Sequence, residues 1–391
     1  MSVVIASAVR TAIAAFQGGL AGVGAPALGA AVVRGAVERA GIAPGDVDLV
    51  LLGQVLQAGA GQAPARQAAR MAGLPDRVPA VTINKMCGSG MEAVIQAYRA
   101  IALGDARVVV AGGMESMTNA PYLLPGARGG LRLGDGAIAD SILLDGLVNA
   151  DDGRHMGSCA EWCATEFSFS RADQDAFAVR SYRRAQAAIA SGAAAREIVP
   201  VEVRDRRGRV AVFEVDEAPA RVDYDRLPTL RPVFEPDGTV TAGNASSLND
   251  GAAALVIMDE RLAGERGATV RARIRGYAGM AQAPAEFTTA PIGAMRALFD
   301  RTGWDPADVD VYEVNEAFSL VTMAAIAAFG LDPERVNPFG GAVSLGHPIG
   351  ASGARILVTL LNALDTLGGR RGVASICIGG GEALALAVER A

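Results

Sequence analysis

The sequence predicts an α/β protein built from two similar halves, with a loop domain inserted between them. Apolar strand-like runs alternate with helical stretches in residues 1–118 and again near the carboxyl terminus. This order is typical of a mainly parallel sheet covered by helices. Short motifs also recur at a nearly constant offset, and the alternation stops between residues 119 and 241, where Pro, Gly and Arg become dense.

The first half shows the alternation in six elements. In chain order we expect them at residues 3–8, 28–40, 47–52, 78–83, 88–103 and 108–111. The stretch 88–103 has apolar side chains on overlapping faces, which predicts a buried helix, and Gly104 ends it. The opening run lacks the basic, apolar and small-residue order of a secretory signal, so we interpret it as the first strand.

Two repeats link the halves. GIAPGDVDLV from Gly41 resembles GWDPADVDVY from Gly303 at an offset of 262 residues, and GGME from Gly112 is echoed by GGGE from Gly379 at an offset of 267. Such motifs are also common beside strands in general, so they favour a duplication without requiring one. We expect a first half at 1–118 plus 244–267, an inserted loop domain at 119–243 and a second half at 268–391.

The inserted segment has features of its own. Residues 171–191 have the composition of a polar helix, and the Arg-rich residues 204–209 indicate a solvated hairpin tip, with a phosphate contact as the alternative. Loops on a rigid scaffold often supply functional contacts. We therefore expect this domain to contribute to ligand binding.

Composition limits the possible functions. The chain has 391 residues, of which 51% are hydrophobic and 20% charged, and its net charge is −6. Charges or turns interrupt each apolar stretch before the roughly 18 residues that span a bilayer, so we expect no membrane span. The acidic balance argues against nucleic-acid binding. Four cysteines without a disulfide or zinc spacing indicate a reduced, cytoplasmic protein with no metal site.

Cys87 is the first candidate for chemistry. It lies in NKMCGSG, between a strand and the helix expected from residue 88. The positive end of a helix dipole favours a thiolate, and the neighbouring glycines allow a substrate to approach the backbone. The sequence therefore predicts a nucleophile, with an inert buried cysteine as the alternative. Lys85, the only lysine, is expected to be a solvated charge.

His347 stands before a second helix, in GHPIGASG. It follows Cys87 by 260 residues, close to the repeat offset, so two equivalent helix starts would place these residues face to face. The positive end of the helix dipole disfavours imidazolium and leaves a neutral imidazole that can accept a proton. A structural hydrogen-bonding histidine is the alternative.

Two further residues end apolar strands. Cys377 precedes three glycines, whose N–H groups could stabilise an oxyanion or simply form a tight hairpin. Asn315 could cap the helix from Ala317 or direct its amide into the same crevice. A cysteine, a histidine, a second cysteine and Gly-rich turns are the components of covalent acyl transfer combined with proton abstraction beside a carbonyl.

The sequence resembles the thiolase family in five stretches that follow one another in the family's order. They are HMGSCAE from His155, TAGNASSLNDGAA from Thr241, NEAF from Asn315, GHPIGASG from Gly346 and CIGGG from Cys377. The resemblance covers essentially the whole chain and implies the layered fold with βαβαβαββ halves. It also implies reversible Claisen condensation of two acetyl-CoA to acetoacetyl-CoA, or its thiolysis, without any cofactor beyond the coenzyme A thioester substrate.

The family also implies roles for individual residues. Cys87 becomes S-acylated, His347 activates it and polarises the second thioester, and Cys377 is the general acid and base at the substrate α-carbon. Asn315, through a held water, completes one oxyanion site with His347, while the N–H groups of Cys87 and Gly379 form the other. The implied coenzyme A contacts are Leu147, His155, Met156, Phe234, Ala245, Ser246, Ala317 and Phe318, with Arg221 at the phosphate or adenine.

His155 and Met156 resemble the short-chain branch of the family, but other positions depart from its pattern. Ser247 replaces a glycine, and Arg221 falls one residue later than usual. Phe287 and the following Thr stand where short-chain members have Met-Gly, in a segment that lines the acyl pocket. These departures leave open a longer-chain 3-ketoacyl-CoA thiolase.

Two other functions are compatible with parts of this sequence. A noncatalytic acyl-CoA or lipid carrier could use the same fold, whereas a ketoacyl carrier-protein synthase would need a histidine in place of Cys377, and the chain has no third histidine. Cys159 and Cys163 follow a helical stripe and are expected to pack in the core. The resemblance implies a homo-oligomer, a dimer of dimers, in which residues 121–140 resemble a tetramerisation loop.

Overall fold

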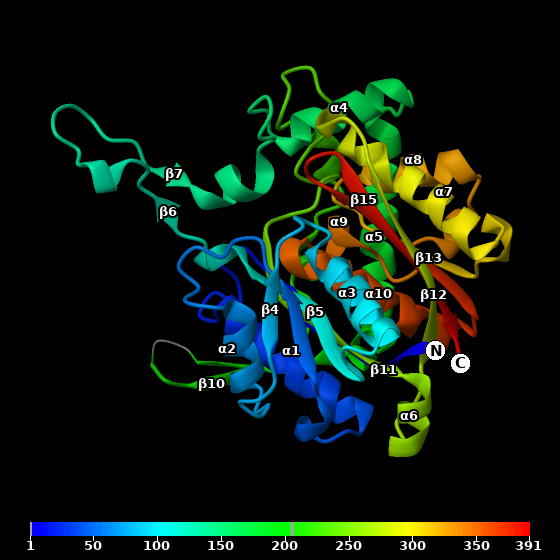
Figure 1. Cartoon of the computed structure of the whole chain (residues 1–391). Helices are drawn as coiled ribbons and strands as arrows, with labels where there is room; N and C mark the ends of the chain where they lie inside the picture. Colours follow the sequence, from blue (N-terminus) through cyan, green and yellow to red (C-terminus); the bar gives the residue numbers. More distant parts are fainter. Residues whose placement is uncertain (1, 205–206) are drawn as a thin grey trace.

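The computed structural model describes residues 2–204 and 207–391, whose longest strands form one mixed sheet (Figure 1). Its strand order is β13–β14–β15–β12–β1–β11–β5–β3–β4. The first half supplies β1 (Val3–Thr11), β3 (Leu49–Gly53), β4 (Ala80–Ile83), β5 (Val108–Ser116) and β11 (Asn249–Asp259). The second half supplies β12 (Ala272–Ala281), β13 (Val311–Val314), β14 (Arg371–Ile378) and β15 (Glu382–Arg390). The halves join where β1 pairs with β12.

The two halves have the same strand order, which confirms the duplicated fold. Moving outward from the junction, β1–β11–β5–β3 in the first half corresponds to β12–β15–β14–β13 in the second. The outer pairs β5–β3 and β14–β13 are parallel, whereas the inner pairs are antiparallel. The expectation of a mainly parallel sheet was wrong, because the last strand of each half returns antiparallel between its neighbours.

Helices cover the sheet in layers. α3 (Ser89–Leu103) and α10 (Ile349–Leu367) pack together between the two halves and share one apolar cluster with strands of both. α1 (Ala25–Ala40) and α2 (Pro64–Met71) cover the other face of the first half, and α7 (Ala290–Thr302) and α8 (Ser319–Phe329) cover that of the second. The helix starts near Cys87 and His347 are thereby brought to the centre of the molecule.

The inserted segment contains α4 (Met156–Glu166) and α5 (Arg171–Ala190), and α5 confirms the predicted polar helix. The strands β9 (Val201–Arg204) and β10 (Val210–Phe213) pair as a hairpin. Residues 205–206 of its predicted tip lie outside the described residues. An arm with the short strands β6 (Tyr122–Leu123) and β7 (Ala139–Asp140) extends away from the body (Figure 1). The exact borders of the three segments stay a prediction.

Short elements complete the chain. They are β2 (Ala14–Ala15), β8 (Ile198–Val199), α6 (Glu260–Arg266), α9 (Ala342–Leu345) and the single turns η1 (Pro44–Asp46), η2 (Met117–Asn119), η3 (Ala127–Gly129), η4 (Leu143–Leu147), η5 (Ala194–Arg196), η6 (Ala218–Arg221), η7 (Leu227–Thr229), η8 (Pro284–Thr289), η9 (Pro306–Asp308) and η10 (Pro333–Arg335). Within the described residues, the helices are too short or too polar to cross a bilayer.

Candidate active site

A pocket of about 310 Å³ collects residues from both halves and from the inserted domain. Its lining is mainly apolar with a few polar side chains, which is typical of a small-molecule site. The predicted site residues on its wall are Cys87, Leu147, His155, Met156, Phe234, Ala245, Ser246, Ala317, Phe318, His347 and Gly379. The structure thus brings together most of the residues singled out from the sequence.

Cys87 lies in a tight turn between β4 and α3. Met86 precedes it with a left-handed backbone, φ 46°, which a residue other than glycine rarely adopts. The Oγ atom of Ser89 accepts a hydrogen bond from the Lys85 N–H at 2.8 Å and donates one to the Met86 carbonyl at 2.6 Å. These local bonds fix the turn that presents the cysteine.

The surroundings of the partly exposed Cys87 side chain favour the thiol over the thiolate. Burial raises its pKa to about 11, and hydrogen bonds from the backbone N–H groups of Gly379 and Cys87 itself oppose this rise only in part. Desolvation is the largest cause of this shift. The helix begins at Ser89, two residues later, and the expected effect of its dipole on the thiol stays a prediction. Cys87 needs a base to become nucleophilic.

His347 has the properties of such a base. It is buried immediately before α10, and burial together with the charge of Arg355 lowers its pKa to about 3. Its Nδ1 lies 2.6 Å from the Oγ of Ser352, and that hydroxyl donates to the Pro348 carbonyl at 3.0 Å. With the hydroxyl hydrogen on this carbonyl, Nδ1–H donates to the Ser352 Oγ, and in that tautomer Nε2 has the free lone pair.

Cys377 and Asn315 are fully buried, two residues before the wall residues Gly379 and Ala317. Burial raises the pKa of Cys377, and so does the charge of Cys87 when ionised. Asn315 does not cap α8, whose N-cap is Phe318. Its Oδ1 accepts a hydrogen bond from Arg355 at 3.3 Å.

Two polar atoms of the site have no hydrogen-bond partner among the residues that the structure describes. They are Asn315 Nδ2 and His347 Nε2, and both are buried. An unpaired buried polar group is costly, and native structures keep few of them. Asn315 Nδ2 is therefore a free donor, and His347 Nε2 is a free acceptor that becomes a donor once it takes up a proton.

Gly379, Gly380 and Gly381 form the turn between β14 and β15. The last two have positive φ angles of 94° and 85°, so the turn requires glycine. The stretch is thus a tight hairpin turn, and Gly379 lines the pocket beside Cys87. The use of its N–H as an oxyanion donor stays a prediction.

Aromatic side chains line the mouth of the pocket. His155 accepts a hydrogen bond from the Gly157 N–H at 3.0 Å and stacks on Phe234 with 4.6 Å between ring centres. Phe287 also lines the pocket and meets Phe318 edge to face. Within the described residues, the lining does not include Arg221, which is exposed and pairs with Glu217 at 3.1 Å. Its contact with coenzyme A stays a prediction.

Three other residues named from the sequence lie outside the pocket wall. Cys159 and Cys163 are fully buried in an apolar cluster, as expected for packing. Lys85 is partly exposed, as expected, and it also forms an ion pair with Glu382.

The side chains that support the site have little signal in the sequence. Glu115 of β5 is fully buried and accepts hydrogen bonds from the N–H groups of Val55 and Gly350, both at 2.9 Å. It thereby joins the first half to the turn that contains His347. Burial raises its pKa to about 7. The repeat of GGME drew attention to Glu115, but neither Ser352 nor Arg355 had a comparable signal.

Two protein-family models match the chain, one over each part of it. The family model described as thiolase, N-terminal domain, matches residues 3–261, and the model of the thiolase C-terminal domain matches residues 268–390. An acetyl-CoA acetyltransferase of Pseudomonas aeruginosa is 50% identical over 389 residues, 99% of each chain. One from Escherichia coli K12 is 51% identical, over 99% of this chain and 98% of the relative.

A solved structure extends the comparison to three dimensions. The crystal structure of the Bacillus anthracis acetyl-CoA acetyltransferase matches with a TM-score of 0.97 at 42% identity. The match covers 100% of this chain and 99% of that one.

Proposed function

The chain belongs to the thiolase family, and from this premise we propose that it is an acetyl-CoA acetyltransferase. The enzyme condenses two acetyl-CoA molecules to acetoacetyl-CoA and free coenzyme A, or runs the reverse thiolysis. The observation that supports this activity most is the meeting of Cys87, His347 and the Gly379 N–H in one pocket. A thiol, a neutral base and an oxyanion donor are what acyl transfer from a thioester requires.

In the proposed first half-reaction, Nε2 of His347 accepts the Cys87 proton as the sulfur attacks the acetyl carbonyl. As the resemblance implies, the N–H groups of Cys87 and Gly379, which both line the pocket, stabilise the resulting oxyanion. The carbon–sulfur bond to coenzyme A then breaks, and the leaving thiolate accepts the proton of Cys377. This half-reaction leaves acetyl-Cys87, a Cys377 thiolate and an imidazolium at His347.

In the second half-reaction, the Cys377 thiolate removes an α-proton from the next acetyl-CoA. The enolate oxygen receives hydrogen bonds from Nε2–H of His347 and, as the resemblance implies, from a water held by Asn315; both side-chain nitrogens are unpaired among the described residues. The enolate carbon attacks acetyl-Cys87 and displaces its sulfur. His347 returns its proton to Cys87, which restores every group to its resting state.

Phe287 departs from the short-chain pattern of the family, but its bulk in this pocket favours short acyl chains. It is buried, lines the pocket and contacts Phe318. A bulky ring at this point reduces the space beside the acyl group. One methylene group in such a pocket alters specificity by about 10- to 200-fold.

Steady-state thiolysis tests the proposal. We expect turnover of acetoacetyl-CoA, kcat/KM values that decrease as the 3-ketoacyl chain lengthens, and no turnover by Cys87→Ala. Higher kcat/KM for longer chains would identify a longer-chain thiolase. Saturable binding of acyl-CoA without turnover would contradict enzymatic activity and indicate a carrier.

We also propose a homo-oligomer, a dimer of dimers, located in the cytoplasm. The arm at residues 122–140, which extends from the body (Figure 1), supports the assembly. It exposes the side chains of Leu131, Leu133 and Ile138. Exposed apolar side chains gathered on one segment are typical of interaction sites. The free thiols of Cys87 and Cys377 suit a reducing compartment.

A further inference from the structure

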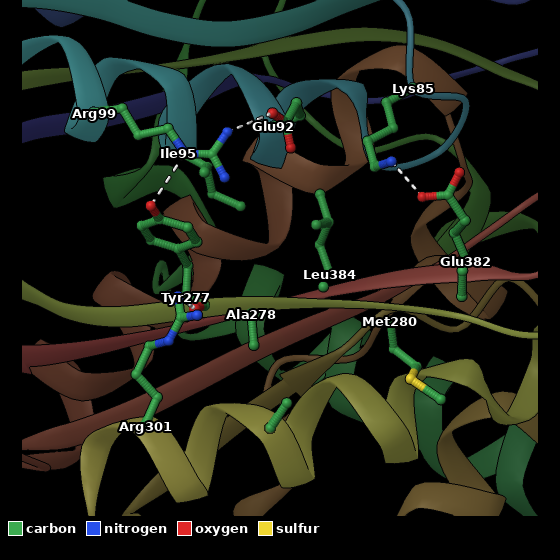
Figure 2. Close-up of a pocket in the computed structure, with 13 residues that line it drawn as sticks. Lys85, Glu92, Ile95, Arg99, Tyr277, Ala278, Met280, Arg301, Glu382 and Leu384 are labelled. Atoms are coloured by element: carbon green, nitrogen blue, oxygen red, sulfur yellow. Dashed lines mark hydrogen bonds and ion pairs between the residues drawn. The ribbon is translucent and has the colours of Figure 1, made fainter.

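An ion pair connects the two turns that position the catalytic cysteines. Lys85 lies in the Cys87 turn, and Glu382 is the first residue of β15, directly after the Gly379–381 turn. Figure 2 shows the Lys85 ammonium directed at the Glu382 carboxylate across the gap between α3 and β15. The pair therefore joins the first half of the molecule to the second.

The same two segments also meet through apolar side chains. A Cβ atom on Gly88 would lie 2.4 Å from Ile378 Cδ1 and 3.3 Å from Leu384 Cδ1, so side chains of the β14–β15 hairpin pack against the cysteine turn. The ion pair and this apolar contact therefore join the same two segments.

The neighbouring charges are engaged elsewhere. Lys85 and Glu382 line a surface pocket of about 610 Å³ together with Glu92, Arg99 and Arg301. Arg99 pairs with Glu92 at 3.5 Å, and Arg301 donates to the Tyr277 carbonyl at 2.7 Å (Figure 2). Lys85 and Glu382 are thus each other's charged partners, and their side chains are 28% and 39% exposed, so added salt can reach them.

We propose that Lys85 and Glu382 are positioning residues that hold the Cys87 turn against the Gly379–381 turn. This inference rests on the proposed function. Neither residue touches the reacting atoms. Their effect is on the spacing between the Cys87 sulfur, its oxyanion donors and Cys377, and displacement of reacting groups by about 1 Å can lower a rate by about 100-fold.

The test compares Lys85→Met, Glu382→Gln and the exchanged pair Lys85→Glu/Glu382→Lys in the full-length enzyme. For each single variant we expect kcat for acetoacetyl-CoA thiolysis to fall by roughly three- to tenfold, with KM within about twofold of wild type. The exchanged pair should recover at least half of the lost kcat. Wild-type kcat at saturating substrate should also decrease between about 0.05 and 1 M NaCl, and Lys85→Met should lose this response.

The matched control is Arg271→Met. Arg271 pairs with Asp365 at 2.5 Å with similar exposures of 23% and 41%, but it lies outside the active site. We expect this control to retain kcat. Three results would each overturn the positioning role. They are single variants with wild-type kcat, an exchanged pair with a kcat no higher than that of the single variants, and an equal loss of kcat in the control. An inactive wild type would instead contradict the proposed function.

Discussion

At the scale of single residues, the site is built from neutral groups rather than from a preformed ion pair. Burial raises the pKa of Cys87 to about 11 and lowers that of His347 to about 3. The sequence was sufficient to identify both residue types and their places before two helices. It could not give the protonation state of Cys87, because desolvation depends on the surrounding chain rather than on neighbouring residues.

The raised pKa predicts how Cys87 reacts with iodoacetamide in the absence of substrate. Only the thiolate is alkylated, and below a pKa of about 11 its fraction rises tenfold with each pH unit. We expect the second-order rate constant to rise about tenfold per unit from pH 6 to 9 without a plateau. Peptide mass spectrometry of Cys87 measures this rate, and a plateau near neutral pH would show a preformed thiolate.

Ser352 fixes the tautomer of His347, which leads to a second prediction. In Ser352→Ala the Nδ1 hydrogen loses its acceptor, so Nε2 is no longer held as the lone pair that accepts the Cys87 proton. We expect kcat to fall by about 10- to 100-fold, with a much smaller change in KM. Ser7→Ala is the control, because Ser7 is equally buried but bonds to the Ala36 carbonyl. Equal kcat in both variants would exclude this role for Ser352.

At the scale of elements, close contacts between glycine backbones set the distance between the halves. A Cβ atom on Gly113 of β5 would lie 2.1 Å from the Gly350 carbonyl oxygen at the start of α10. Apolar alternation was enough to predict β1, α1, α3 and β5. It did not predict α2. The predicted end of β5 was also too early, because the GGME sequence resembles a turn although it forms part of a buried strand.

Gly113→Ala is therefore expected to be strongly destabilising. The added methyl group must push α10 away from β5, which should lower the free energy of unfolding by about 3 kcal/mol and reduce activity by moving His347. Chemical denaturation measures the change. Gly264→Ala, a helical site where an added Cβ has open space among the described residues, should be neutral or stabilising by up to about 1 kcal/mol. Similar unfolding energies for both variants would contradict the close contact.

At the scale of the whole molecule, the duplicated fold explains why residues 260 positions apart share one pocket. Equivalent helix starts in two equivalent halves meet at the centre, as the repeat offset suggested. The pairing of Lys85 with Glu382 could not be predicted in this way, since it depends on how closely the halves pack. The arm at residues 122–140 was identified from the family resemblance, whereas its protrusion from the body is a property of the structure.

The arm yields a prediction about assembly. Leu133 is fully exposed there, so Leu133→Asp should weaken contacts between copies and convert the larger oligomer to a smaller one. Light scattering coupled to size exclusion measures the mass. Leu103→Asp, at an exposed leucine outside the arm, should leave the mass unchanged. An unaltered mass in Leu133→Asp would place the interface elsewhere.

The central claim is that Cys87 accepts the acyl group while Cys377 serves only as acid and base. Intact-mass spectrometry after incubation with acetyl-CoA tests it most directly. We expect an added acetyl group of roughly 42 Da on Cys87 in the wild type and in Cys377→Ala. The Cys377→Ala variant should retain the acetyl group and form no acetoacetyl-CoA. The Cys87→Ala variant should show no added mass. An acetyl group on Cys377, or none on Cys87, would contradict the account.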